Sequence, residues 1–250
     1  MPDMKPILTL LCAVLALLPL STRAAETLDE ILGKNTAAMG GREALDAMKS
    51  FSYTSTLKVT PSSDNEQPYQ GSSKSNYKSP DKAHAAITFH GTTRVHATNG
   101  KQYWEWDSSQ PLTGVTIITT AIAQSRIDDA KISNTYLANL PSLGVKLELT
   151  GVEKVGDREA YVIQTTRPYG SQTRIFIDKE SGLMIKEASS ASARWLSDWR
   201  KVDGVMFAHK VRLVYADRVA EMTLDNVKVN PEVADDIFNP PPSVPRSQTP

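Results

Sequence analysis

Apolar and polar residues alternate along most of the chain, in short runs that are separated by turn residues. The alternation is clear between residues 173 and 215, where two strand–turn–strand units follow one another. Their turns, at residues 178–182 and 202–204, contain the glycine that supplies a positive φ in tight hairpins. Residues 51–59 alternate in the same way, as a half-buried strand does. The pattern predicts an antiparallel sheet built mainly of consecutive hairpins.

Another hairpin is expected at Asn99-Gly100, a dipeptide that favours a two-residue type I′ turn. A turn of this length would place Val95 directly opposite Trp104. Trp104 and Trp106 would then lie on the same face of the sheet as Val95.

Two stretches depart from the strand pattern. Thr27 and Glu30 have the spacing of a helix capping box, and Gly40-Gly41 would end that helix. Between residues 117 and 140, apolar residues recur at multiples of about 3.6, which predicts one or two amphipathic helices. Helices inserted between strands can cover one open side of a curved sheet. We therefore predict an α+β fold: a curved antiparallel sheet, or incomplete β-barrel, with an N-terminal helix and a helical lid insert.

The first residues resemble an export signal. Lys5 precedes an apolar run at residues 7–20, and small residues follow, so residues 1–25 are predicted to be a cleavable signal peptide. The single cysteine, Cys12, follows the bulky Leu11 inside this run, which does not suit lipid attachment. The mature chain would then contain no disulfide.

The remaining chain suits one domain of ordinary size, which we place at residues 26–239 of the 250. Residues 240–250 are proline-rich and polar, and are predicted to be a disordered tail. The formal net charge is +0 and no basic stripe is present in the sequence, so a nucleic-acid partner is not expected.

Motifs that would indicate catalysis or metal binding are weak. Residues 75–78 (SNYK) and 63–65 (SDN) match two motifs of acyl-serine enzymes, but in reversed order and without the third motif. If His84 and His90 share one strand, they lie about 20 Å apart at ~3.3 Å per residue, too far for one metal ion. We predict no enzyme, no metal site and no cofactor.

His209 and the tryptophans each allow two interpretations. His209 lies on an apolar strand face. It is either a core histidine with a satisfied hydrogen bond or a polar group inside a ligand cavity. Aromatic residues on a sheet can form the core or a ligand platform. On the concave face of a partly closed sheet, the same residues can do both.

Several turn and strand signatures resemble those of the LolA/LolB-like family of outer-membrane lipoprotein-sorting proteins. The resemblance covers nearly all of the mature chain and implies a half-barrel of antiparallel strands with helices over its mouth, at residues 26–239. It also implies transport of lipoprotein acyl chains or other lipids across the periplasm, or sensing of misplaced lipoproteins. It identifies no individual ligand-binding residue. The signatures are Met39-Gly40-Gly41 with Glu43-Ala44-Leu45, Asn99-Gly100 with Trp104, Leu149-Thr150-Gly151, Ala160-Tyr161-Val162, Ile177-Asp178, Ser181-Gly182-Leu183, Trp199-Arg200, Val202-Asp203-Gly204-Val205, Asn230, Asp236-Ile237-Phe238 and Pro240.

Two functions remain open. The first is a periplasmic binding or carrier protein of a Gram-negative bacterium, whose ligand is a lipid or lipoprotein acyl chain that enters beneath the helices at residues 117–140. Envelope proteins are candidate partners, and peripheral contact with the membrane is compatible with this role. The alternative is a non-carrier interaction or sensor module of the envelope with a filled core. The residues expected to line a hydrophobic cavity are Phe89, Trp104, Trp106, Ile118, Ile122, Tyr136, Leu140, His209, Val211 and Leu213.

Overall fold

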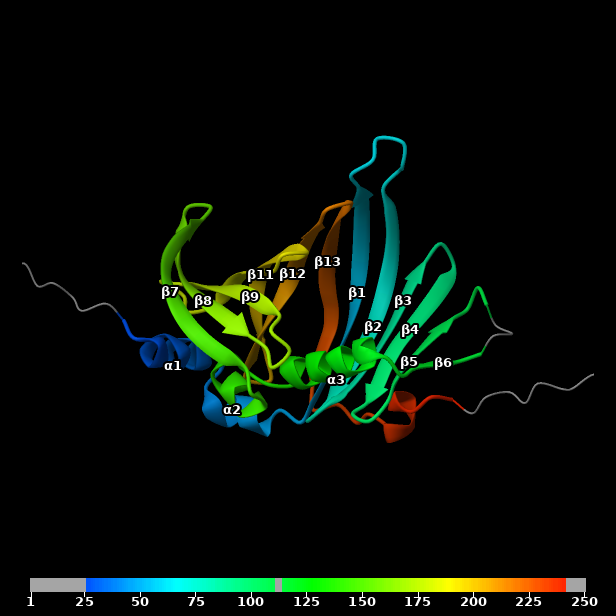
Figure 1. Ribbon diagram of the computed structural model, residues 1–250, viewed down its shortest axis with the longest axis horizontal. Helices are drawn as coiled ribbons and strands as arrows, with labels where there is room; N and C mark the ends of the chain where they lie inside the picture. Colours follow the sequence, from blue (N-terminus) through cyan, green and yellow to red (C-terminus); the bar gives the residue numbers. More distant parts are fainter. Residues whose placement is uncertain (1–25, 111–113, 242–250) are drawn as a thin grey trace, which may run out of the picture.

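A computed structural model describes residues 26–110 and 114–241 (Figure 1). The predicted signal peptide, with Cys12, and most of the predicted tail lie outside the described residues and stay predictions. The helices are α1 (Leu28–Ala38), α2 (Arg42–Ala47) and α3 (Ala121–Ser133), with the 3-10 helices η1 (Leu137–Leu143) and η2 (Asp235–Phe238).

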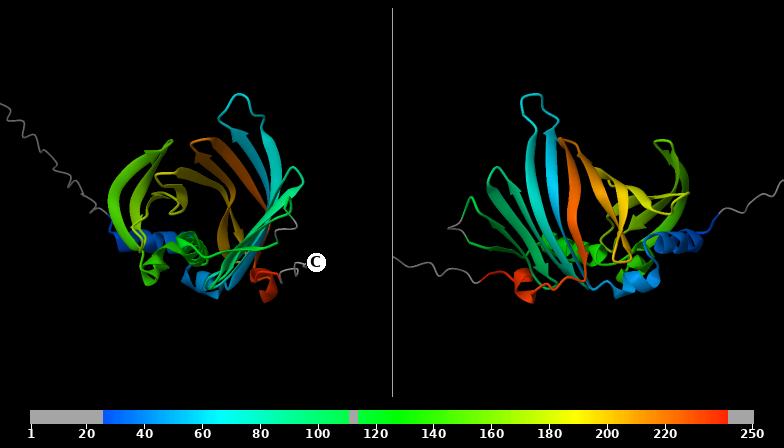
Figure 2. Two further views of the ribbon diagram at one scale, coloured as in Figure 1. Left: turned by 45° about the vertical axis from the view of Figure 1, so that its right-hand side comes forward. Right: turned by 180° about the vertical axis from the view of Figure 1, so that it is seen from behind.

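The strands form one antiparallel sheet of thirteen, in the order β6-β5-β4-β3-β2-β1-β13-β12-β11-β10-β9-β8-β7. The sheet bends into an open trough whose edges stay apart (Figures 1 and 2). The predicted α+β fold with a curved, unclosed sheet is therefore confirmed. The strands are β1 (Ser50–Pro61), β2 (Tyr69–Lys78), β3 (Lys82–Phe89), β4 (Thr92–Asn99), β5 (Tyr103–Asp107), β6 (Thr116–Ile118), β7 (Lys146–Val155), β8 (Arg158–Thr166), β9 (Gln172–Asp178), β10 (Met184–Ala188), β11 (Ser192–Val202), β12 (Val205–Tyr215) and β13 (Arg218–Val229).

The strand order determines where the helical insert must run. Strands β1 to β6 and strands β7 to β13 form two meanders, which are joined where β1 pairs with β13. The two edge strands, β6 and β7, are consecutive in the chain, and α3 and η1 connect them. The connection therefore crosses the open side of the trough, with α3 lying across its lower part (Figure 1).

Helix α1 begins at the predicted capping box. The Thr27 hydroxyl accepts the Glu30 backbone N–H (3.3 Å), and the Glu30 carboxylate accepts the Thr27 backbone N–H (2.7 Å). The buried Asn35 side chain donates to the Gly182 carbonyl (2.8 Å), which fixes α1 against the β9–β10 turn. A hydrophobic core joins α1 and η1 to strands β7–β9 and contains Ile31, Leu32, Leu137, Leu140, Val145, Tyr161, Ile163, Ile175 and Ile177.

The helical insert is present but begins later than its hydrophobic pattern predicts. Ile118 belongs to strand β6 and pairs with Tyr103, because the edge of β5 offers unpaired backbone groups. Helix α3 starts at Ala121 and packs Ala123 and Ile127 against Tyr103. The helical phase predicted from Ile118 was therefore wrong, although the helical insert itself is confirmed.

The register predicted at Asn99-Gly100 was also wrong. The Asn99 side chain accepts the backbone N–H of Gln102 (2.9 Å), so the loop is longer than the two residues assumed. Val95 consequently lies opposite Trp106 instead of Trp104, a shift of two positions. Because side chains alternate with a period of two, this shift leaves every residue on its predicted face.

Gly40 lies where the α1–α2 junction meets the β11–β12 turn. Its φ is +124°, and a Cβ atom would lie 2.2 Å from the Gly204 carbonyl oxygen. We expect Gly40→Ala to lower the free energy of unfolding by about 1–3 kcal/mol, measured by urea denaturation. The matched control is Gly33→Ala inside α1, where nothing lies within 4 Å and a gain of about 0.5–1 kcal/mol is expected. Equal effects of the two substitutions would contradict this explanation.

Candidate functional site

An apolar cavity of about 350 Å³ lies between the concave face of the sheet and the helices. Strands β1, β2 and β9–β13 line one side, and residues of α1, α2, α3 and η1 line the other. Leu196, Val211 and Met222 lie on the sheet side, while Tyr136 and Leu140 belong to the insert. We call this space the apolar cavity.

A backbone irregularity in β11 brings an additional aromatic residue to the cavity. Ser197 pairs with Lys210 and Trp199 pairs with Ala208, so one residue on each strand lies between these pairs. Asp198, at this point of β11, has a φ of +55°. Residues three apart on a regular strand point to opposite faces, yet Leu196 and Trp199 both line the cavity. The positive φ of Asp198 distorts the backbone and accounts for this arrangement.

The cavity contains a few polar groups among its apolar walls. The Trp199 indole N–H is buried and has no hydrogen-bond partner among the described residues. A buried donor without an acceptor is costly, so an oxygen atom of a bound molecule would relieve this cost. The proximity of Tyr53, together with burial, raises the pKa of Tyr77 well above its usual value, so this hydroxyl stays neutral at physiological pH.

A polar groove of about 1210 Å³ continues from the apolar cavity. It lies beside α3, along the β8–β9 and β10–β11 turns, and its walls carry serine, threonine and glutamine side chains. Arg194 of β11 and Glu187 of β10 form an ion pair at the junction of the two spaces. We call this space the arginine groove. The residues that line both spaces are Ile132, Ser133, Glu187 and Arg194.

Contacts on both sides hold α3 over the trough. On one side Arg167, after β8, forms an ion pair with Asp129 of α3. On the other side Ala123 and Ile127 of α3 pack against Tyr103 of β5. The insert can therefore separate from the sheet only if these contacts break.

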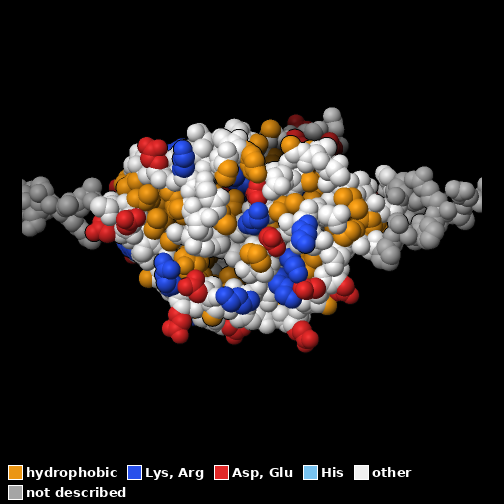
Figure 3. Space-filling model, turned by 60° about the horizontal axis from the view of Figure 1, so that its bottom comes forward, with side chains coloured by type: hydrophobic (Ala, Val, Ile, Leu, Met, Phe, Trp, Pro, Cys, Tyr) orange, Lys and Arg blue, Asp and Glu red, His pale blue; other side chains and the backbone are white. Residues whose placement is uncertain are grey.

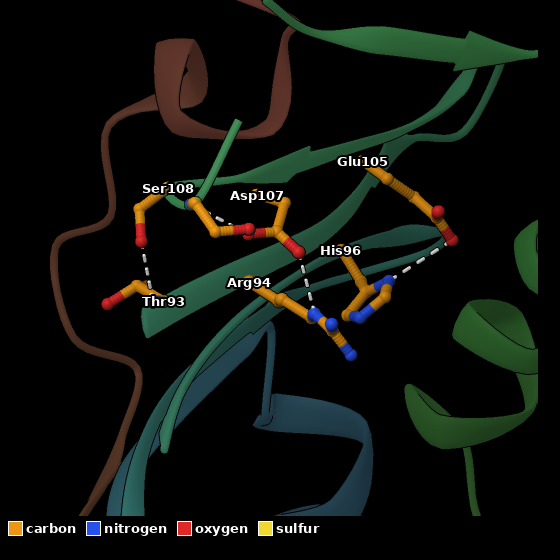
Figure 4. A network of polar contacts seen from close by, with 7 residues as sticks. Thr93, Arg94, His96, Glu105, Asp107 and Ser108 are labelled. Atoms are coloured by element: carbon orange, nitrogen blue, oxygen red, sulfur yellow. Dashed lines mark hydrogen bonds and ion pairs between the residues drawn. The ribbon is translucent and has the colours of Figure 1, made fainter. Parts of the chain in front are cut away.

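Polar side chains of β4 and β5 lie around Tyr103, where α3 packs against the sheet. The Tyr103 hydroxyl donates to the Glu105 carboxylate (2.7 Å), and His96 Nδ1 lies 3.2 Å from the same carboxylate oxygen (Figure 4). Burial, followed by the hydrogen bond to Glu105, raises the pKa of Tyr103 above its usual value. Nearby, Arg94 donates to Asp107 (2.8 Å), so this part of the sheet is joined by paired charges (Figure 4).

Four of the ten residues predicted to bind a ligand lie in these two spaces. Tyr136, Leu140 and Val211 line the apolar cavity, and Leu213 lines the arginine groove.

The structure places the other six elsewhere. Trp104 and Trp106 pack with Val95 and Ala97, and the Trp104 indole N–H donates to the Phe238 carbonyl (2.9 Å). Ile118 belongs to the β5–β6 pairing, and Ile122 lies at a 60% exposed position of α3. Phe89 packs against the ring of Tyr69. His209 is buried, and its Nδ1 lies 3.1 Å from the Phe207 carbonyl oxygen.

Sequence reasoning did not select Trp199 and Arg194. Trp199 lies outside the period-two pattern because the positive φ of Asp198 distorts the strand, and Arg194 is a charged residue, whereas only apolar residues and one histidine were selected. The four-residue spacing of Trp195 and Trp199 would place both indoles on one face of a regular strand, whereas only Trp199 lines the cavity, so the sequence contained no local signal for its position.

Hydrophobic side chains on the face that carries the helices form separate patches among charged residues (Figure 3). Among the described residues, no three or more metal-ligating side chains converge. No helix in the same part of the chain has the length and apolar character needed to cross a bilayer.

The comparisons with known proteins identify a fold. No protein-family model and no curated protein matches the chain. The solved structures that match include a DUF1329 family protein from Desulfovibrio piger, with a TM-score of 0.58, 13% identity and coverage of 86% of this chain and 98% of that one. A LolA superfamily protein from Nitrosomonas europaea matches with a TM-score of 0.58, 15% identity and coverage of 86% and 98%.

A putative outer membrane lipoprotein-sorting protein domain from Vibrio parahaemolyticus matches with a TM-score of 0.55, 12% identity and coverage of 84% and 95%. At these identities the similarity concerns the fold. The chain therefore has the fold of LolA superfamily proteins, as its turn and strand signatures indicated.

Proposed function

We propose that this protein is a lipid-binding or carrier protein in the periplasm of a Gram-negative bacterium. Its ligand is a lipid or the acyl chain of a lipoprotein, held between the sheet and the α3–η1 insert. The apolar cavity is the observation that carries this proposal, because it lies beneath the insert that could open it. Each buried methylene would contribute about 0.8 kcal/mol to binding.

Other observations support the same role. The signal-peptide pattern at residues 1–25 supports export, and the Vibrio protein of the same fold is described as lipoprotein-sorting. The unpartnered Trp199 N–H would gain an acceptor from an occupant. The protein acts by binding and release, not as an enzyme, with envelope proteins as candidate exchange partners and the membrane surface as the place of exchange. A module with a filled core is less well supported, because the cavity has no side chain filling it.

Native mass spectrometry of the protein purified from the periplasm tests the proposal. After removal of bound lipid, incubation with fatty acids or lysophospholipids should add the mass of one ligand per protein. A protein that remains empty with every lipid supplied would contradict the proposal. The same spectra report whether the protein as purified already carries a ligand.

A further inference from the structure

The arginine groove gives the proposed lipid site a second compartment of different chemistry. Its walls include four arginines and two carboxylates, those of Asp129 and Glu187, and Arg174 also pairs with Glu153 beside the groove, which leaves an excess of one positive charge. The whole chain has a formal net charge of +0, so this excess is local. The arginines are Arg126, Arg167, Arg174 and Arg194.

The arginines come from elements that the fold brings together. Arg126 and Arg167 share the single carboxylate of Asp129, and the Arg126–Asp129 contact is 3.6 Å. Neither arginine therefore has a carboxylate of its own within the groove. Arginine is suited to carboxylate and phosphate groups, because its planar guanidinium presents paired N–H donors to two oxygens.

Arg194 lies where the apolar cavity meets the groove, and lines both. Its neighbour towards the cavity is Leu196, two residues further along β11, and across the strand pair lies Leu213. A molecule whose tail occupied the cavity would thus place its polar end beside Arg194. The change from an apolar to a cationic side chain on this face of β11 therefore occurs within two residues.

The size of the apolar cavity limits the number of chains. Its volume of about 350 Å³ is near the lower end of the ~300–1,000 Å³ typical of small-molecule pockets. This volume suits one acyl chain better than two or three.

We infer that the ligand is a single-chain amphiphile with an anionic head group. The tail lies in the apolar cavity, and the carboxylate or phosphate head lies in the arginine groove between Arg194 and Arg167. This inference rests on the proposed function, since it names the class of lipid bound at the same site.

The test is a competition assay with a fluorescent fatty-acid probe, using ligands below their micelle concentrations. Palmitoyl lysophosphatidic acid and monopalmitoyl glycerol form a matched pair, because they share the same acylglycerol and only the first carries a phosphate. Palmitic acid separates a carboxylate head from a phosphate head, and dipalmitoyl phosphatidic acid adds a second chain. We expect anionic single-chain ligands to bind at least about tenfold more tightly than the neutral one, since charge-assisted hydrogen bonds contribute about 1.5–3 kcal/mol.

Two variants locate the head group. Arg167→Gln and the paired substitution Glu187→Gln with Arg194→Gln should each weaken binding of the anionic ligands about tenfold. Because Arg167 also holds α3 and Arg194 also lines the apolar cavity, the readout is the ratio of the affinities for lysophosphatidic acid and monopalmitoyl glycerol, which should fall about tenfold in each variant. The double substitution removes both members of this partly exposed ion pair, so no carboxylate is left unpartnered. Arg212→Gln is the control, because Arg212 lies on β12 over the ring of Trp195 and lines neither space.

Each outcome decides a separate point. Equal affinity for lysophosphatidic acid and monopalmitoyl glycerol would overturn the anionic head group, yet leave lipid binding intact. Equal affinity for dipalmitoyl phosphatidic acid and lysophosphatidic acid would overturn the inference that the ligand has a single chain. Failure of every ligand to bind would instead contradict the proposed function.

Discussion

Val211→Trp should weaken lipid binding roughly a hundredfold while leaving the protein folded. Val211 lies on β12 opposite Leu196, and both residues line the apolar cavity. An indole at this position would occupy space that about four methylenes of an acyl chain need, at ~0.8 kcal/mol each, which corresponds to a loss of roughly a hundredfold in affinity. Native mass spectrometry and probe competition measure the loss.

The control for this substitution lies on the next residue of the same strand. Arg212 is exposed and lines neither the cavity nor the groove, so Arg212→Trp adds the same side chain without filling the site. We expect Val211→Trp to cost about 1–3 kcal/mol of stability at most, as overpacking does, which urea denaturation would report. A folded Val211→Trp protein that takes up lipid with unchanged affinity would place the binding site elsewhere.

Phe238→Ala should cause the largest loss of stability among single substitutions considered for this chain. Phe238 is 0% exposed, and its carbonyl accepts the indole N–H of Trp104 of β5. Helix η2, which ends at Phe238, thereby covers the face of β3 and β4 opposite α3. Truncating a fully buried phenylalanine removes about 3–5 kcal/mol, measured as the free energy of unfolding in urea.

Asp235→Asn, at the start of the same 3-10 helix, is the matched control. Asp235 forms ion pairs with Lys78 (2.7 Å) and Lys82 (3.1 Å), but its side chain is 58% exposed. Surface ion pairs of this kind contribute about 0–1 kcal/mol, so a small change is expected. If Phe238→Ala cost no more than Asp235→Asn, η2 would not be an essential cover of the sheet.

Local sequence determined the turns whenever only backbone geometry mattered. Asp203-Gly204 adopts the predicted turn, with φ values of +46° and +91° and with Val202 paired to Val205. Asn99-Gly100 has the same preference, but the Asn99 side chain binds backbone N–H groups of its own loop and lengthens it. The identity of a turn was thus readable from the chain, whereas its length depended on a competing side-chain hydrogen bond.

The site shows a different division. Alternation assigned Val211 and Leu213 to one strand face, and these residues line the apolar cavity and the arginine groove, while Tyr136 and Leu140 come from the helical insert. Alternation could not show that Trp104 faces away from the cavity. Periodicity assigns residues to one face or the other but does not say which element covers each face. In the folded protein η2 covers that face, so Trp104 belongs to a core.

By itself, the sequence determined the strands, most of the turns, the capped N-terminal helix and the presence of a helical insert, because all of these follow from local periodicity and backbone preferences. Only the tertiary structure decided that β1 pairs with β13, which joins the two meanders into one continuous trough. It also decided that Trp199 enters the cavity and that Arg126, Arg167 and Arg194 meet beside it. These positions arise from contacts between segments far apart in the chain, which no local pattern encodes.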